Sequence, residues 1–243
     1  MPISPLLRKL ANSLVLTDAE QSAVRGVPVR ITEIAADQDV AREGERLRRS
    51  CIVLKGVACS YKIGALAKRQ ILNLHIAGDL PDLQSLHLPV LDMSIAGITP
   101  CTMGFLDHRA LDDLCAAFPR IAGALWRETL IDAVRFRERI ATLGTRNAYS
   151  RLAHAFCEYF VRSDAVGLVV DNAVEFPLTQ QELGDMLGLS TVHVNRSLQE
   201  MRSENLISLK GTRLQVLDWA RLRQVAEFDP AYLNIKQAAM HLM

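Results

Sequence analysis

The sequence predicts an α+β fold in which short strands come first, one long helix follows, and a helical region with a β-hairpin comes last. Three observations carry this prediction. Short apolar segments recur between Arg30 and Asp107, an unbroken helical stretch covers 120–143, and two capped helices precede a hairpin after Thr179. Of the 243 residues, 49% are hydrophobic and 23% are charged, so the chain can bury the core of one large or two small domains.

The N-terminal part is predicted to be an all-β barrel or sandwich that follows a short helix at about 13–25. Glycines separate short apolar segments throughout this region, and three of these segments, 51–54, 72–76 and 101–105, have the composition of strands. The last two also alternate with a period of two residues, which is typical of half-buried strands.

A long helix is predicted over 120–143, because Pro119 suits a first helical turn and no proline follows it there. At 1.5 Å per residue this helix spans roughly 36 Å. Gly144 is expected to end it and to act as a hinge. Five residues follow the 4-3-4-3 spacing of a coiled-coil seam: Trp126, Leu130, Ala133, Arg137 and Ile140.

This helix can pack on its own strand region or on a second copy of the chain. We favour a dimer seam, because a second apolar side, with Ile121, Leu125 and Phe136, remains available to face the strands.

Residues 179–202, TQQELGDMLGLSTVHVNRSLQEMR, are predicted to form two short helices joined by a tight turn. Thr179 and Glu182 have the spacing of a capping box, in which each side chain accepts a hydrogen bond from the backbone amide of the other. Gly188 suits the end of the first helix, and Ser190 suits the N-cap of the second.

The second of these helices has a buried side and a polar side. Val194, Leu198 and Met201 are expected to point toward a core, while the Arg, Asn and Gln side chains opposite can bond to base edges and phosphates. The alternative is a plain helical hairpin with a solvated face. The segment 206–217 alternates like a β-hairpin, however, and a helix-turn-helix followed by a hairpin is a winged helix.

This segment resembles the DNA-binding domain of the Crp/Fnr family of bacterial transcription regulators, through LTQQELGDMLGLS and HVNRSLQEMRSENLIS. The resemblance implies a jelly-roll-like β-roll of the cyclic-nucleotide-binding type over 1–118 and a long dimerisation helix with a hinge over 119–146. It implies a winged helix-turn-helix with a C-terminal tail, expected to be helical, over 147–243. It also implies a homodimer that binds a palindromic operator and responds to a signal at the β-roll.

The resemblance assigns DNA contacts to the two helix starts, the exposed side of the second helix and the hairpin. Arg196 matches the base-reading arginine of the family, whereas Val192 replaces a glutamate that reads cytosine in relatives. A valine cannot accept that bond but can contact a thymine methyl group. The expected contact residues are Thr179, Gln180, Ser190, Thr191, Val192, His193, Asn195, Arg196, Gln199 and Lys210.

The effector region departs from the relatives that bind cyclic AMP. Asp82 and Leu83 stand where those relatives have a Gly-Glu pair, and the next segment contains Asp92 and no arginine. Because a carboxylate repels a phosphate, we do not expect cyclic AMP to bind. The residues expected to line the effector pocket are Gly78, Asp79, Asp82, Leu83, Asp92, Phe136 and Arg137.

Arg137 has two interpretations. As a charge in the seam, it can pair with Glu128 or Glu138 or extend into water. Alternatively, it can face the pocket of the β-roll and hold a small anionic effector or an acid that competes with it.

The sequence does not identify a cofactor, and it gives no support for an iron–sulfur cluster or haem. The five cysteines are widely spaced and are expected to be buried small side chains. None lies before Cys51, so the resemblance does not support the iron–sulfur cluster of some relatives. His75 and His87 are isolated, so we expect neither haem nor a bound metal.

The expected partners are double-stranded DNA and a second copy of the chain, with RNA polymerase and a small anionic effector as candidates. No run of 18 apolar residues occurs, which favours a soluble, cytoplasmic protein without a membrane partner. An enzyme is the second class, but no nucleophile elbow, phosphate loop or zinc-protease spacing appears. A third class is a protein-interaction module whose winged helix does not bind DNA; salt-sensitive DNA binding distinguishes it.

Overall fold

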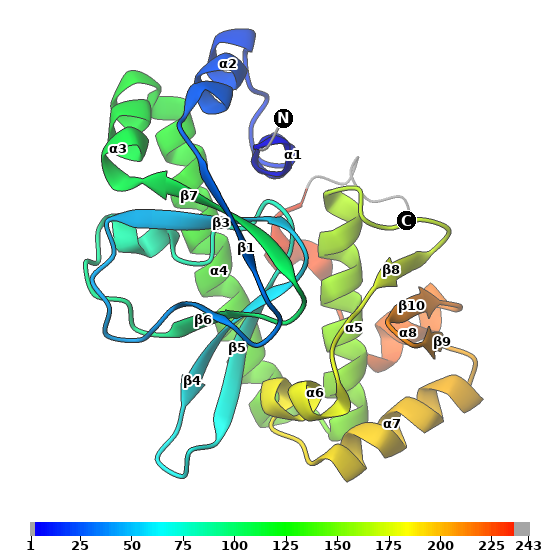
Figure 1. The fold of residues 1–243 in the computed structure, drawn as a ribbon. Helices are drawn as coiled ribbons and strands as arrows, with labels where there is room; N and C mark the ends of the chain where they lie inside the picture. The colour runs from blue at the N-terminus through cyan, green and yellow to red at the C-terminus, as the bar shows by residue number, and fades with distance from the viewer. Residues whose placement is uncertain (1–2, 236–243) are drawn as a thin grey trace. The chain divides into compact units, whose positions relative to one another are not determined.

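The structure, a computed structural model, describes residues 3–235 and divides the chain into two compact units, Met1–Asp132 and Ala133–Met243. The predicted α+β class and the order of strands, long helix and helical region with a hairpin are confirmed (Figure 1). The elements of the first unit are α1 (Ser4–Ala11), α2 (Asp18–Gly26), β1 (Arg30–Ile34), β2 (Asp39–Ala41), β3 (Arg49–Lys55), β4 (Ala58–Ile63), β5 (Arg69–His75), the 3₁₀ helix η1 (Leu83–Leu86), β6 (Ser94–Gly97), β7 (Cys101–Asp107), α3 (His108–Ala117) and the start of α4 (Pro119–Thr145).

The strands of the first unit form two antiparallel sheets, with orders β1-β7-β3 and β2-β6-β4-β5. Strand β3 is buried on both faces. Its Cys51 and Val53 belong to one apolar core with residues of the second sheet, whereas Ile52 belongs to a core shared with α1, α3 and α4. Side chains alternate along a strand, so a strand between two cores is apolar at successive positions.

The N-terminal segment contains one helix more than the sequence predicted. The expected helix begins at Asp18, behind a capping box of Thr17 and Glu20, and a separate helix, α1, precedes it. Leu6 and Leu10 of α1 are buried in the core beside α3 and α4. The eight residues of α1 are too few to show a periodic pattern clearly, so packing reveals the helix where periodicity did not.

The long helix α4 is continuous over 27 residues. Ile121 and Leu125 are buried in the core of the first unit, as expected. The seam side chains Trp126, Leu130 and Ile140 are 68%, 52% and 70% exposed in the single chain. One side of α4 is therefore covered in the first unit, while an apolar row on another side remains open.

The second unit contains the end of α4 followed by a helical domain with a small sheet. The sheet has the order β8-β10-β9; the β9–β10 hairpin was predicted, whereas the three-residue strand β8 was not. Its remaining elements are α5 (Ala148–Ala165), β8 (Ala173–Glu175), α6 (Gln180–Leu187), α7 (Thr191–Ser203), β9 (Ile207–Lys210), β10 (Arg213–Val216), α8 (Trp219–Val225) and the 3₁₀ helix η2 (Pro230–Leu233). The rest of the predicted helical tail, 236–243, lies outside the described residues.

A buried carboxylate ties α4 to α5 within the second unit. Glu158 of α5 receives Arg135 at 3.1 Å, Arg139 at 3.7 Å and Arg162 at 3.8 Å, and it accepts a hydrogen bond of 2.7 Å from the Tyr232 hydroxyl. Burial alone would raise the pKa of Glu158, but the three guanidinium groups outweigh burial and lower it. Glu158 is therefore ionised and fully paired.

Hydrogen bonds from α5 hold the chain around Gly144, the residue expected to act as a hinge. The Arg151 guanidinium donates to the carbonyl of Leu143 at 2.6 Å and to that of Arg146 at 2.8 Å. The helix also runs one residue past Gly144, to Thr145. The two compact units separate earlier, between Asp132 and Ala133, so the last turns of α4 belong with α5.

Replacing Glu158 by Gln should destabilise the second unit by roughly 3–5 kcal/mol, because two buried arginines, Arg135 and Arg162, and the half-buried Arg139 would lose their counter-charge. Trp219 packs against Phe160 and Phe228 in this unit, so its fluorescence during urea unfolding, in a Trp126→Phe background, reports the change. The exposed Glu175→Gln variant is the control and should unfold like its parent. Equal stability of the two variants would show that the arginines do not depend on Glu158.

Candidate nucleic-acid interface

The helix-turn-helix of the second unit is fixed by local capping and a close turn. Thr179 caps α6: the Glu182 amide donates to its hydroxyl at 3.2 Å, and the Thr179 amide donates to the Glu182 carboxylate at 2.7 Å. Gly188 ends α6 with a left-handed φ of +65°. A Cβ on Gly184 would lie 2.6 Å from the Leu189 carbonyl oxygen, so a side chain there would push α6 away from the turn.

The second helix, α7, begins at the predicted cap and buries the predicted side. The His193 amide donates to the Ser190 hydroxyl at 3.3 Å. Val194, Leu198 and Met201 are at most 2% exposed, so this apolar side fixes the rotation of α7 about its axis.

The opposite side of α7 is open to solvent. Val192 is 73% exposed, and Arg196 is exposed without an ion pair among the described residues. An apolar side chain beside an unpaired guanidinium, on a helix whose other side is buried, can meet both methyl groups and acceptors of base edges. The predicted contact residues that the structure places in exposed positions are Thr179, Gln180, Ser190, Thr191, Val192, His193, Arg196, Gln199 and Lys210.

Asn195 differs from the other predicted contacts because it is half-buried. Its side-chain amide donates to the side-chain oxygen Oε1 of Gln180 at 3.2 Å, which links the start of α6 to α7. A bidentate contact from Asn195 to adenine uses Oδ1 and one of the two N–H groups of Nδ2, so the bond to Gln180 occupies the other N–H or competes with this contact. The sequence showed both residues but could not show that they bond to each other.

The hairpin carries a further exposed cation, Arg213, that is not among the predicted contact residues. Gly211, with a φ of +59°, forms the turn between β9 and β10, and Arg213 lies opposite Lys210 in the pairing register. Both side chains are exposed. The Arg202 guanidinium donates to the Leu209 carbonyl at 3.1 Å and so fixes the hairpin to the end of α7. Arg213 is recognised as a neighbour of Lys210 only from the pairing register of β9 and β10, which the sequence alone does not give.

The predicted effector residues Gly78 and Asp79 have structural roles in the first unit. A Cβ on Gly78 would lie 2.6 Å from the Pro5 carbonyl oxygen, so α1 packs directly on this turn. Asp79 accepts a hydrogen bond of 2.8 Å from the Ile76 amide and pairs with Lys9, which also reaches Glu128 at 3.2 Å. These groups join α1, the turn and α4.

Asp82 and Leu83, also predicted to line the effector pocket, are 1% and 6% exposed. The Asp82 carboxylate accepts a hydrogen bond of 2.7 Å from the Cys51 amide, while Leu83 packs in the core beside α1, α3 and α4. Asp92 is exposed. The structure does not bring these side chains together around a cavity, because two of them point into the protein interior.

Phe136 and Arg137 belong to the second unit, where Phe136 is half-buried and Arg137 is exposed. Both acids considered as partners for Arg137 are engaged elsewhere: Glu138 receives Arg146 at 2.9 Å, and Glu128 receives Lys9. Arg137 therefore extends into solvent in the single chain.

Cysteine burial was predicted correctly for four residues, while Cys115 is half-buried; all five are free thiols. Among residues 3–235, no three His, Cys, Asp or Glu side chains form a group that could hold a metal ion. Within the same range, no helix is both long enough and apolar enough to cross a bilayer.

Asp82→Asn should remove a pH-dependent loss of stability. Burial raises the pKa of Asp82 to about 7, against the opposing effect of its bond from Cys51, so the folded state holds a proton that the unfolded chain releases near pH 4. Stability from this group is complete below that pH and is lost as pH rises through 7. Between pH 5 and pH 8, wild type should lose about 2 kcal/mol more than the variant.

Urea unfolding at both pH values measures this difference, and Asp92→Asn, which alters an exposed carboxylate of the same segment, is the control. If wild type and Asp82→Asn had the same pH dependence, the buried carboxylate would not titrate in this range.

Comparison with known proteins finds one matching family model and several similar regulatory proteins. Residues 150–225 match the model of the Crp-like helix-turn-helix domain. The fumarate and nitrate reduction regulatory protein of Vibrio cholerae is 23% identical over 223 residues, covering 90% of this chain and 88% of that protein. The transcriptional activator protein FnrL of Cereibacter sphaeroides is 25% identical over 198 residues, covering 80% and 79%.

The structure of FixK2 from Bradyrhizobium japonicum has the same fold, with a TM-score of 0.73, 21% identity, and coverage of 82% of this chain and 98% of that one. The matched domain contains α6, α7 and the β9–β10 hairpin, whose geometry is that of a winged helix-turn-helix. Residues 150–225 are thus similar to the Crp-like helix-turn-helix domain, and the chain as a whole is similar to the two regulators named above over 80–90% of its length.

Proposed function

We propose that the protein regulates transcription as a homodimer, with α7 of each subunit in the major groove of a palindromic operator, under control of a signal received by the first unit. The observation that carries the DNA contact is the exposed side of α7, where Arg196 has no ion pair among the described residues. A guanidinium that is not paired within the protein is available for a guanine edge.

Phosphate contacts complete this proposed interface. The starts of α6 and α7 present backbone amides and the exposed polar residues Gln180 and Thr191. Helix starts favour anions because the first amides lack partners within the helix. Lys210 and Arg213 add two cations on the hairpin, which Arg202 fixes to the end of α7. Cations placed at particular points, rather than a broad basic surface, agree with a net charge of +1 for the whole chain.

The dimer contact is proposed on the exposed row of α4. Trp126, Leu130 and Ile140 are large apolar side chains that remain more than half exposed in one chain. Such a row at coiled-coil spacing favours a parallel helix from a second copy. Two subunits related by a two-fold axis would present two equivalent α7 helices, which explains why a palindrome is the expected site.

The alternative is a protein-interaction module in which the α7 surface contacts another protein. The unpaired Arg196 and the two cations of the hairpin favour DNA over that alternative. Proteins similar to this chain over most of their length are transcription regulators, and we propose that this chain likewise is not an enzyme.

Arg196→Ala should weaken operator binding by about 1–3 kcal/mol and relax the base preference at one position of each half-site. Fluorescence anisotropy at fixed salt measures the affinity, with single-base variants of the operator to locate the relaxed position. Arg109→Ala, an exposed arginine of α3, makes the same charge change away from α7 and should bind DNA like wild type. Unchanged affinity of Arg196→Ala would exclude the assigned side of α7 from the interface.

Leu130→Asp should convert the dimer into a monomer, because burying two unpaired carboxylates in the seam costs several kcal/mol, on the order of 3 or more. Sedimentation equilibrium measures the assembly state. The Leu66→Asp variant alters a side chain that is 93% exposed and lies outside α4, so it should stay dimeric. A stable dimer of Leu130→Asp would place the subunit contact elsewhere.

A further inference from the structure

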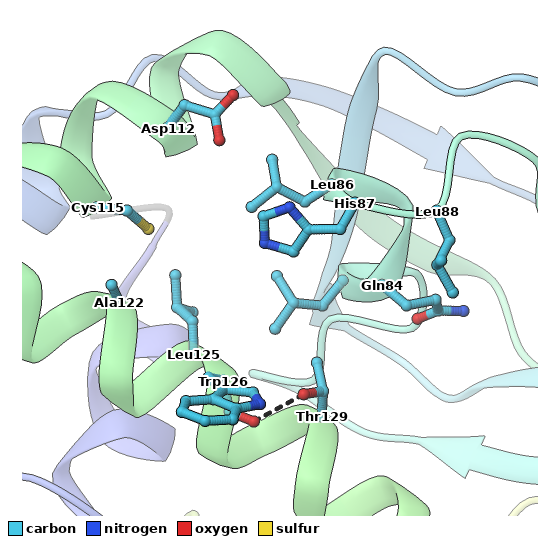
Figure 2. Close-up of a pocket in the computed structure, with 11 residues that line it drawn as sticks. Gln84, Leu86, His87, Leu88, Asp112, Cys115, Ala122, Leu125, Trp126 and Thr129 are labelled. Atoms are coloured by element: carbon cyan, nitrogen blue, oxygen red, sulfur yellow. Dashed lines mark hydrogen bonds between the residues drawn. The ribbon is translucent and has the colours of Figure 1, made fainter.

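The first unit contains a cavity of about 440 Å³ between η1, α3 and α4 (Figure 2). Its volume lies within the range of small-molecule sites. Of the residues expected to contact an effector, only Leu83 lines it. The cavity is therefore separate from the turn that contains Gly78 and Asp79.

Most of the cavity wall is apolar. Leu86 enters from the η1 side, and Leu125 and Trp126 enter from α4. A wall of leucine side chains and an indole ring gains free energy when an aromatic or aliphatic group replaces water. The ligand should therefore have an apolar body.

The carboxylate of the lining favours a ligand that carries a hydrogen-bond donor. This carboxylate belongs to Asp112, which is exposed and forms no salt bridge within residues 3–235, and no lysine or arginine lines the cavity. The side chains of Gln84 and His87, which also line it, can each donate as well as accept a hydrogen bond. The Thr129 hydroxyl donates to the Trp126 carbonyl at 2.7 Å, which leaves its oxygen as an acceptor. A carboxylate and a hydroxyl acceptor attract an ammonium group and repel an anion. The face of the indole ring attracts a cation as well.

We propose that this cavity binds a small amine with an aromatic or aliphatic body, its ammonium group directed to Asp112 and its apolar body against Leu125 and Trp126. The class of ligand thus differs from the anionic effector expected from Arg137. Trp126 also belongs to the exposed row of α4, so an occupied cavity would alter one residue of the proposed seam. Binding of the amine does not depend on the proposed function; only the idea that the amine is the signal for the regulator rests on it.

Three naphthalene compounds of nearly equal size test the site by calorimetry on the full chain at pH 7. We expect 1-naphthylmethylamine to bind about tenfold more tightly than 1-naphthalenemethanol, a difference typical of one favourable ion pair, and 1-naphthoate not to bind detectably. Equal affinity for the three compounds, or no binding of the amine, would overturn the proposal.

Variants locate the binding in this cavity. Asp112→Asn should lower the affinity for the amine about tenfold and leave that for the alcohol unchanged, whereas Asp113→Asn, which alters the neighbouring carboxylate outside the lining, should change neither. Ala122→Phe should fill the cavity and abolish binding of both compounds, while the exposed Ala117→Phe should not. If Ala122→Phe fails to fold, the Asp112→Asn result decides alone. Amine binding that survives Asp112→Asn unchanged would contradict the site.

A separate readout distinguishes this proposal from the proposed function. Arg196→Ala should bind the amine like wild type, because Arg196 lies in the other unit. If wild type binds the amine but no DNA, the regulator proposal is wrong and the site is supported. If DNA binds and the amine does not, the site is wrong and the regulator proposal is unaffected.

Discussion

The burial of Glu158 among three arginines is the constraint on which the second unit depends. Helix α5 is buried without interruption from Leu152 to Ser163, so any charge on it must find its partner inside the protein. Arg135 and Arg139 of α4 supply two of those partners, at 3.1 and 3.7 Å. An uncompensated buried charge is strongly destabilising, so α4 cannot leave α5 without a large cost. The end of the long helix and the helical domain therefore form one compact unit.

The two ends of α4 are held by different interactions. Its first turns are buried through Ile121 and Leu125 in the core beside β3 and α3, while its last turns are held by ion pairs to α5. Between the two compact units the helix is unbroken. A change at the start of α4 can therefore be transmitted along one continuous helix to the turns that are paired with α5. The proposed dimer seam lies on this same helix.

Local features could be predicted from the sequence, and features that depend on distant contacts could not. The capping box at Thr179, the left-handed Gly188 and the buried side of α7 follow from spacings of three or four residues, and the structure contains all of them. The Gln180–Asn195 bond and the Arg135–Glu158 pair join residues 15 and 23 positions apart, so no periodicity reveals them. Asp82 was assigned to a pocket by its place in a motif, but burial depends on how η1 packs against β3, which a motif does not contain.

In the proposed regulator, two α7 helices contact DNA together across a two-fold axis. Selection of binding sites from a pool of random double-stranded DNA by the wild-type protein tests it most directly. We expect enrichment of an inverted repeat whose half-sites are centred one helical turn, ~10 bp, apart, with a guanine in each half-site. Enrichment of a single half-site, of a direct repeat, or of no sequence at all would contradict it.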